Sequence, residues 1–355
     1  MELFLRLVRI ALWQREEELP EEISANMAAN ILRGAREQGL LGLVINALMR
    51  SKVRMPEEQG LEMMVMLMKV KQSNEKVNEG LRRLKELFDE RGIDYAVVKG
   101  QAVGAYYPDP TLRQAGDIDY YCDAMNFPKA QEAVREAWGI DTETYEERHI
   151  HYEYKGIAYE GHFMLFMFYK KKLDRYWLQL MEGYGGTTIH ANGMEVKTLS
   201  PTLHTLFVFL HLFVHLMDLG VGFRHFCDLA VMLHYCREEI DHDRMREALG
   251  RLGMEKAYRA IGCILTDRLG LPPQDIGYEL NDRDRSYTKR IMEIVRHRGN
   301  MGQYNMLTDN MGWKNTLELA CIKTAHFIKL WPLSPGYCTR WFFHKFKKHS
   351  PLLCG

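Results

Sequence analysis

Two aspartates, Asp117 and Asp119, stand one residue apart in RQAGDIDYYCDA, a segment whose other residues are typical of a β-strand. Strands are depleted in aspartate, because its side chain competes for backbone groups that the ladder needs. Residues two apart in a strand project from one face, about 6 to 7 Å apart. Two carboxylates placed in this way repel each other, and a hard cation such as Mg²⁺ relieves the repulsion. The alternative is a strand end at which both aspartates face water.

A third carboxylate, Glu160, interrupts the apolar and aromatic segment IAYEGHFMLFMF, which is predicted to be a strand. Burying a carboxylate without a partner is costly, so we expect Glu160 to point into the same cavity as the two aspartates. His162 follows two residues later, on the same face. Glu153, on the preceding predicted strand, is the alternative third carboxylate.

Positively charged residues precede the aspartates along the chain. A predicted strand ends in Lys99-Gly100, and a proline-rich loop then carries Arg113. Either cation could offset the negative charge that grows on a phosphate leaving group. Each also has a structural explanation, in which Arg113 braces the loop and Lys99 is solvated. Backbone N–H groups after Gly100 could hold phosphate.

The elements that must position these residues follow a simple order along the chain. Apolar spacing predicts helices throughout residues 1–90, short strand patterns fill residues 91–198, and helical spacing resumes from residue 199 to the end. We therefore expect an α+β fold, in which a small mixed β-sheet core is flanked by helical regions. The predicted domains are 1–90, 91–198 and 199–355.

Composition excludes several classes of protein. Lys+Arg and Asp+Glu both number 47, so no overall charge attracts the chain to nucleic acid or to a membrane. No dinucleotide-binding or P-loop glycine pattern is present. Seven scattered cysteines favour reduced thiols in a cytoplasmic protein. The N-terminus is predicted to be an amphipathic helix, and the longest apolar run, which contains three histidines, favours a buried helix over a membrane span.

Together these segments resemble the polymerase-β nucleotidyltransferase superfamily, and most of all its uncharacterised bacterial branch. The match lies in VVKGQAVGAYYPDPTLRQAGDIDYYC, in the acidic-x-His element YEGHFML and in the histidine-rich HLFVHLMDLGVGFRHFCDLAVML. It spans about residues 85–235. One departure concerns Gly100, which the wider superfamily follows with glycine or serine, whereas Gln101 stands here. A serine contact to a nucleotide phosphate is therefore missing.

The resemblance implies an Mg²⁺-dependent transferase that moves an NMP from an NTP, such as ATP, to a hydroxyl and releases pyrophosphate. It implies that Asp117 and Asp119 hold two Mg²⁺ ions, for which Mn²⁺ could substitute. Glu160 would be the third carboxylate, as a ligand of the metal that activates the acceptor hydroxyl or as its base. Two metals about 3.5 to 4 Å apart stabilise both the attacking and the leaving oxygen. The residues implied to contact the nucleotide are Lys99, Gly100, Gln101 and Arg113.

The acceptor is predicted to be a small molecule or a protein side chain. Polynucleotide binding usually needs a stripe of Lys and Arg, whereas the compact basic run near the proposed site is only Lys170 to Lys172. The C-terminal helical region could close a pocket for a small acceptor over the core. The competing hypothesis is a catalytically idle relative that binds a nucleotide or a partner protein through the same pocket.

Two further features have open roles. His204, His211 and His215 form one stripe of a predicted helix, and could contact a base or acceptor or bind a transition metal. Histidines at a packing seam are the more common explanation. The basic-aromatic segment RWFFHKFKKH could touch lipid or nucleic acid, but a solvated or docked helix face is favoured.

Overall fold

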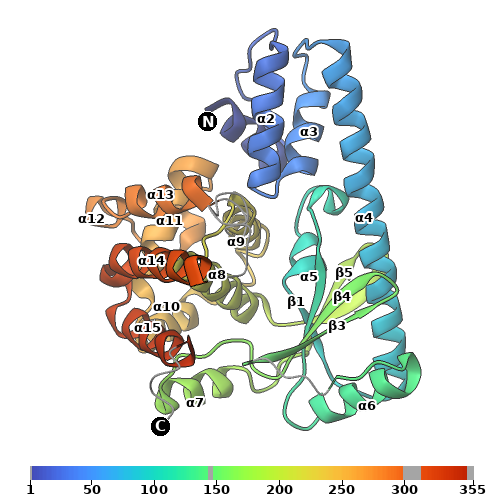
Figure 1. Ribbon diagram of the computed structural model, residues 1–355, viewed down its shortest axis with the longest axis vertical. Coiled ribbons are helices and arrows are strands. Elements are labelled where there is room, and N and C mark those ends of the chain that lie inside the picture. The colour runs from blue at the N-terminus through green and yellow to red at the C-terminus, as the bar shows by residue number, and fades with distance from the viewer. Residues whose placement is uncertain (1, 143–146, 299–312, 350–355) are drawn as a thin grey trace. The chain divides into compact units, whose positions relative to one another are not determined.

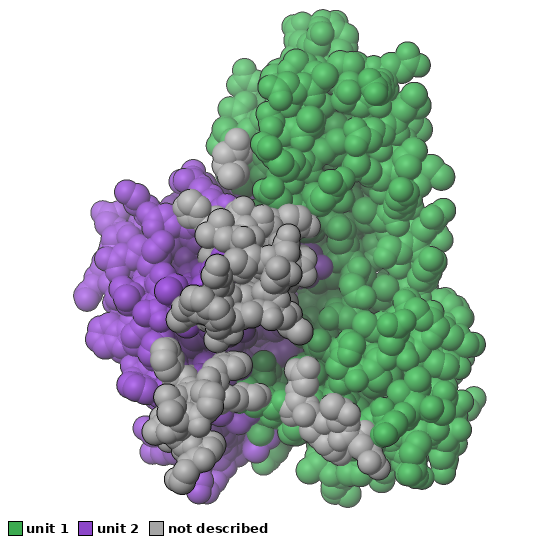
Figure 2. Space-filling model, in the orientation of Figure 1, with its two compact units in different colours: residues 1–165, 182–204 green, residues 166–181, 205–355 purple. Residues whose placement is uncertain are grey.

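The chain divides into two compact units, which Figure 2 colours separately. The computed structural model describes residues 2–142, 147–298 and 313–349. Unit 1 comprises residues 1–165 and 182–204, and unit 2 comprises residues 166–181 and 205–355. The N-terminal helices and the β-sheet thus belong to the same unit by their contacts. The division into three domains remains a prediction.

Four helices open unit 1, as the apolar spacing predicted (Figure 1). They are α1 (Glu2–Trp13), α2 (Ala25–Glu37), α3 (Leu41–Arg50) and α4 (Glu57–Glu90). Ser24 caps α2 by accepting a hydrogen bond from the backbone N–H of Met27. The long helix α4 ends just before Gly92, whose φ of +60° suits a residue without a Cβ.

The second half of unit 1 is a mixed β-sheet, which confirms the predicted α+β class. Its strands are β1 (Ala96–Val98), β2 (Asp117–Tyr121), β3 (His149–Tyr154), β4 (Ile157–His162), β5 (Thr187–Ala191) and β6 (Met194–Thr198). They lie in the order β3-β4-β2-β1-β6-β5, with β2–β4 and β1–β6 parallel and the other pairs antiparallel. Strand β4 is shorter than predicted, since it ends at His162 and the chain then leaves the sheet.

Two tight turns fix the register of the hairpins in this sheet. Lys155 and Gly156 join β3 to β4 with φ values of +52° and +73°, and Asn192 and Gly193 join β5 to β6 with +51° and +78°. Positive φ at both central residues is the signature of a type I′ turn, whose twist matches that of the flanking strands. Because a slip of one residue would reverse every side chain, these turns also determine which residues share a face.

One face of the sheet is apolar and packs against α4 and α6 (Phe127–Trp138). Ile118, Tyr120 and Tyr159 lie in this core, and the hydroxyl of Tyr159 donates to the backbone carbonyl of Gly80, 3.1 Å away. A Cβ on Gly80 would lie 2.9 Å from that hydroxyl, so glycine is what lets α4 approach the strands. Since side chains alternate along a strand, the polar residues between these positions project from the opposite face.

The N-terminal helices also hold the loop that carries Arg113. The buried side-chain amide of Asn74, on α4, donates to the carbonyls of Thr111 and Arg113 at 2.7 and 2.9 Å. The side chain of Gln114 accepts from the backbone N–H of Leu41 at 2.9 Å. A short helix α5 (Gly100–Gly104) and a 3₁₀ turn (Pro110–Leu112) connect β1 to this loop. The segment before β2 is therefore fixed by α3 and α4.

Unit 2 is helical. Its helices are α7 (Lys171–Leu180), α8 (Pro201–Met217, from Thr205 on), α9 (Phe223–Tyr235), α10 (His242–Leu252), α11 (Glu255–Leu269), α12 (Asp282–Arg285), α13 (Thr288–Arg298), α14 (Trp313–Leu330) and α15 (Pro335–His349), with 3₁₀ turns at Pro273–Ile276 and Trp331–Leu333. Within the described residues, no helix is long and apolar enough to cross a membrane. The basic-aromatic segment lies on α15, where Trp341 is buried and Phe343 is exposed.

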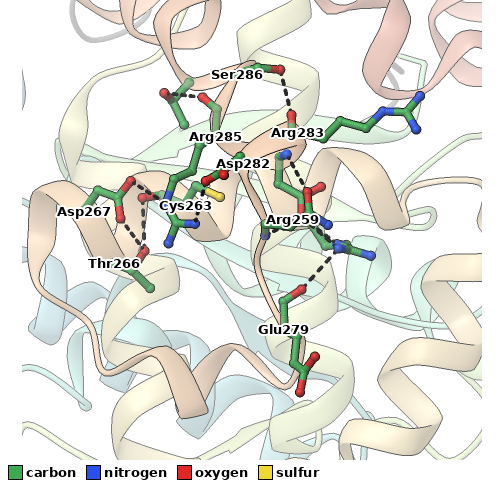
Figure 3. A network of polar contacts seen from close by, with 12 residues as sticks. Arg259, Cys263, Thr266, Asp267, Glu279, Asp282, Arg283, Arg285 and Ser286 are labelled. Carbon is green, nitrogen blue, oxygen red and sulfur yellow. Dashed lines mark hydrogen bonds and ion pairs between the residues drawn. The ribbon is translucent and has the colours of Figure 1, made fainter.

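Ion pairs join α11 to the segment that follows it (Figure 3). Arg259 donates to the carboxylate of Asp284 at 2.8 Å and to the carbonyl of Glu279 at 3.1 Å. Arg285 lies 3.4 Å from Asp267, at the other end of the same network. These contacts tie α12 onto α11, which accounts for a stable four-residue helix at that point.

Candidate functional site

The acidic residues meet across two parallel strands on the polar face of the sheet. Asp119 of β2 lies directly opposite Glu160 of β4, and Asp117 lies opposite Ala158. Residues opposite each other in adjacent strands project from the same face. The structure therefore brings Asp119 and Glu160 side by side, with Asp117 two residues away along β2 on that face.

Lys99 and His162 join this acidic pair. The Nζ of Lys99 lies 2.5 Å from Oδ1 of Asp119 and 3.9 Å from Oε2 of Glu160. The Nε2 of His162 lies 2.9 Å from the same Asp119 oxygen and 3.5 Å from the same Glu160 oxygen. The side chains of Asp119, His162 and Lys99 are 3%, 6% and 14% exposed, while that of Glu160 is 24% exposed. The network is thus closed around Asp119 and opens at Glu160.

These donors fit a divalent cation. One ligand atom each from Asp119, Glu160 and His162 lie within 4.8 Å of one another. Asp117 is half-buried on the same face, and its carboxylate makes no hydrogen bond or ion pair with another residue of the described chain. Carboxylate oxygens suit Mg²⁺, and an imidazole beside them is also compatible with Mn²⁺. The donor set could therefore hold a divalent metal, and Mg²⁺ as that metal stays a prediction.

Electrostatics give the cluster a deficit of positive charge. Burial raises the pKa of Asp119, and the nearby carboxylates of Asp117 and Glu160 add to the rise against the attraction of Lys99. Burial opposes ionisation of Glu160 as well, but its contacts with His162 and Lys99 outweigh burial and lower its pKa. Burial acts to lower the pKa of Lys99, and the three carboxylates reverse this and raise it. One ammonium group thus faces three carboxylates.

Lys99 has a strained backbone conformation, which a hydrogen bond to His204 holds in place. Its φ of +52° is unfavourable for a residue with a Cβ, and such conformations persist only where the surroundings impose them. The N–H of Lys99 donates to Nε2 of the buried His204 at 3.3 Å, and Nδ1 of His204 lies 3.3 Å from Oγ1 of Thr198. That hydroxyl donates in turn to the carbonyl of Val97 at 2.7 Å. Because Nε2 accepts a hydrogen bond, Nδ1 carries the ring proton. His204 therefore links the backbone of Lys99 to Thr198 and braces Lys99.

A family comparison agrees with this geometry. The profile of a family described as uncharacterised nucleotidyltransferase matches residues 25–270, which is more than half of the chain. The chain belongs to this uncharacterised nucleotidyltransferase family. An antigenic nucleotidyltransferase-like protein from Paracoccidioides brasiliensis, known from a crystal structure, is similar at 15% identity and a TM-score of 0.33, over 56% of this chain and 94% of that one. None of the curated proteins matches.

In this nucleotidyltransferase-family chain, the predicted nucleotide-binding residues are not all gathered at the acidic cluster. Gly100 lies against β2, since a Cβ on it would be 3.3 Å from the carbonyl oxygen of Asp117. The side chain of Gln101 is buried and donates to Oδ1 of Asn78, on α4. Arg113 is buried beside α5, with its Cδ 3.6 Å from where a Cβ on Gly104 would lie.

The alternative third carboxylate is placed differently from Glu160. Glu153 is exposed on β3, opposite Ala158, and its carboxylate makes no hydrogen bond or ion pair with another described residue. It shares the polar face but lies one strand further from Asp119 than Glu160 does. The structure therefore puts Glu160, and not Glu153, within ligand distance of Asp119.

The contacts of two contributors did not follow from the sequence. His162 was predicted to share a face with Glu160 but was given no role, and its contact with Asp119 depends on the register between β2 and β4. His204 was grouped with His211 and His215, because all three share a helix stripe. The structure separates them, since His204 contacts β1 and β6 in unit 1 whereas the other two lie in unit 2. Nothing in the sequence distinguished His204 from the other two histidines of the stripe.

Proposed function

We propose that this protein is a divalent-metal-dependent nucleotidyltransferase, which transfers an NMP from an NTP to a hydroxyl group and releases pyrophosphate. The observation that carries the proposal is the pairing of Asp119 with Glu160 across β2 and β4, with Asp117 on the same face. Acidic residues in adjacent strands beside a single lysine form a site whose charge is unbalanced until a cation enters. Membership of the family supports the same class of reaction.

In this proposal Asp117, Asp119 and Glu160 hold two Mg²⁺ ions. The bound ions would supply charge neutralisation for the phosphates and acidify the acceptor hydroxyl. The lowered pKa of Glu160 keeps it ionised near neutral pH, and favours a role as metal ligand over one as general base. His162 fixes the orientation of the Asp119 carboxylate through the 2.9 Å contact. Lys99 offsets charge on the phosphates.

The nucleotide would lie at the start of α5, where Lys99 is the N-cap residue and Gly100 is the first helical residue. The side chain of Gln101 is engaged with Asn78, so only its backbone N–H is available to a phosphate. Arg113 would neutralise phosphate charge from the loop that α3 and α4 hold. A bulkier residue at Gly100 would approach the carbonyl of Asp117, which explains why glycine stands there.

The acceptor proposed is a small molecule or a protein side chain. Lys+Arg and Asp+Glu are equal at 47 each, and the basic run Lys170 to Lys172 is short. A surface that binds a polynucleotide would instead need several Lys or Arg side chains in a row to contact the phosphates. An acceptor with one reacting hydroxyl needs only a closed pocket.

The direct test measures thermal stabilisation by ATP, CTP, GTP and UTP, with and without Mg²⁺, in the wild-type protein and in Asp119→Asn. We expect a stabilisation that requires both Mg²⁺ and one or more NTPs and that disappears in Asp119→Asn. Glu153→Gln is the matched control, because this exposed carboxylate on the same face should leave the response unchanged. Equal stabilisation of wild type and Asp119→Asn by Mg²⁺ and NTP would refute the proposal.

The second candidate is a catalytically idle nucleotide-binding or protein-interaction relative of the same fold. It is favoured by Gln101, whose side chain is turned toward Asn78 at the position where the wider superfamily has a phosphate-contacting serine. Transfer of labelled phosphate from α-labelled NTP to acceptor hydroxyls separates the two candidates. Nucleotide binding that is independent of Mg²⁺, without pyrophosphate release, is the result expected of the idle relative.

A further inference from the structure

Three histidines of unit 2 converge between two helices. His211 and His215 lie one turn apart on α8, and His225 lies in the first turn of α9. The ring centroids of His211 and His215 are 4.3 Å apart, and those of His225 lie 5.8 and 5.5 Å from them. One ring nitrogen from each histidine lies within 4.8 Å of the other two.

Convergence of nitrogens, rather than contact of rings alone, distinguishes this cluster from a packing seam. In a tetrahedral site with Zn–N bonds of about 2.0 to 2.1 Å, neighbouring nitrogens are about 3.4 Å apart. The histidine nitrogens lie within 4.8 Å of one another, so side-chain rotations that move them by about 1 Å would bring them to this separation. His225 is buried, whereas His211 and His215 are half-buried, so that an ion could reach the cluster from the side of α8.

The geometry points to a second metal site: we propose that His211, His215 and His225 bind a transition-metal dication such as Zn²⁺. Three neutral imidazoles suit Zn²⁺, Cu²⁺, Fe²⁺ or Ni²⁺, and are poor ligands for Mg²⁺. Three protein ligands leave a fourth position for water or another small ligand. The proposal does not depend on the nucleotidyltransferase reaction, because its residues belong to unit 2 and the acidic cluster belongs to unit 1.

Bound metal would cross-link α8 to α9 and stabilise unit 2. An ion that binds the folded chain and not the unfolded chain raises the unfolding temperature by mass action. The acidic cluster with His162 could also take a transition metal, so the test must separate the two sites. The variant Asp119→Asn removes a ligand from that cluster and leaves the three histidines intact.

The experiment titrates Co²⁺ into metal-free Asp119→Asn protein and follows the visible d–d absorption of the ion. We expect one equivalent of Co²⁺ with the bands of a four- or five-coordinate site, displaced by Zn²⁺. Removing an outer-shell partner of a ligand lowers metal affinity 10- to 100-fold. Adding His215→Gln to the Asp119→Asn protein removes a ligand itself, and should therefore lower the affinity for Co²⁺ at least about 100-fold. His190→Gln is the control, because His190 is exposed on β5 in unit 1.

Folding is checked in the metal-free variants by circular dichroism and by the unfolding temperature. If His215→Gln does not fold, His211→Gln provides the same comparison one turn earlier on α8. The supporting result is that Zn²⁺ raises the unfolding temperature of Asp119→Asn, and does not raise that of Asp119→Asn protein that also carries His215→Gln or His211→Gln. The inference is overturned if Asp119→Asn binds Co²⁺ only with octahedral, weakly absorbing bands, or if His215→Gln and His211→Gln bind it as well as their parent.

Discussion

At the scale of single residues, the candidate site is defined by its charge balance. Asp117, Asp119 and Glu160 share one face of the sheet, and Lys99 is the ammonium that contacts two of them. The two aspartates could be recognised from the sequence, because carboxylates are rare in a strand. Glu160 could be recognised for the same reason, but the 2.5 Å contact from Lys99 to Asp119 could not, since it depends on side-chain conformation and strand register.

Replacing Lys99 by methionine tests how much its ammonium group contributes to the stability of the acidic cluster. Lys99→Met keeps the length of the side chain and leaves the buried Asp119 without its ammonium partner, which is expected to destabilise the fold by about 3 kcal/mol. Urea unfolding without metal measures the loss, and Mg²⁺ should restore more stability to the variant than to wild type. The control Lys197→Met breaks an exposed pair with Asp94, and should change stability by less than about 1 kcal/mol. Equal effects of the two substitutions would contradict this assignment.

The raised pKa of Asp119 predicts how metal binding depends on pH. A protonated carboxyl is a poor ligand, so Mg²⁺ affinity should fall as pH decreases through this raised pKa. The fall should therefore begin at a higher pH than the ordinary aspartate pKa of about 3.9 allows. In the metal-free protein, the same raised pKa means that protonation of Asp119 stabilises the folded state as pH falls. Mg²⁺ titrations from pH 7.5 down to the ordinary aspartate pKa of about 3.9 test this, and an affinity that stays constant over that whole range would contradict it.

At the scale of elements, the site depends on how closely α4 packs on the sheet. The order of helices and strands followed from apolar periodicity and from the turn residues Asn192 and Gly193. The predicted strand after Glu160 was too long, because Phe166 and Phe168 belong to the aromatic core of unit 2 instead. An apolar run marks burial, but it does not distinguish a strand from an irregular buried segment.

Two glycines of α4 should respond in opposite ways to alanine. In Gly80→Ala the new Cβ would lie 2.9 Å from the Tyr159 hydroxyl and 3.0 Å from Ile118, which should cost about 1 to 3 kcal/mol through overpacking. In Gly60→Ala the nearest atoms, in Met55, are 4.0 Å away. There the gain in helix propensity should stabilise by about 0.5 to 1 kcal/mol. Urea denaturation of both variants measures the difference, and a neutral or stabilising Gly80→Ala would show that the helix has room to move.

At the scale of the whole molecule, the equal numbers of acidic and basic residues make long-range attraction to polyanions weak. Lys+Arg and Asp+Glu are 47 each, and the sequence pI is about 7.2. Binding of single-stranded RNA should therefore be no tighter than the non-specific range, with Kd above about 1 μM at physiological salt. Fluorescence anisotropy at several salt concentrations tests this. Submicromolar binding with a steep salt dependence, accompanied by nucleotide transfer to an RNA end, would replace the small-acceptor proposal.

The pairing of β1 with β6 has a consequence for the order in which the chain becomes ordered during synthesis. Val97 and Thr198 lie opposite each other although about a hundred residues separate them in the chain. While the ribosome adds those residues, β1 is the edge of the nascent sheet, and its open backbone groups can pair with other chains. The carboxylates of β2 and β4 can meet before His204 arrives to brace Lys99. A ribosome stalled before residue 198 would therefore hold a chain whose acidic pair is assembled and whose lysine is still unsupported.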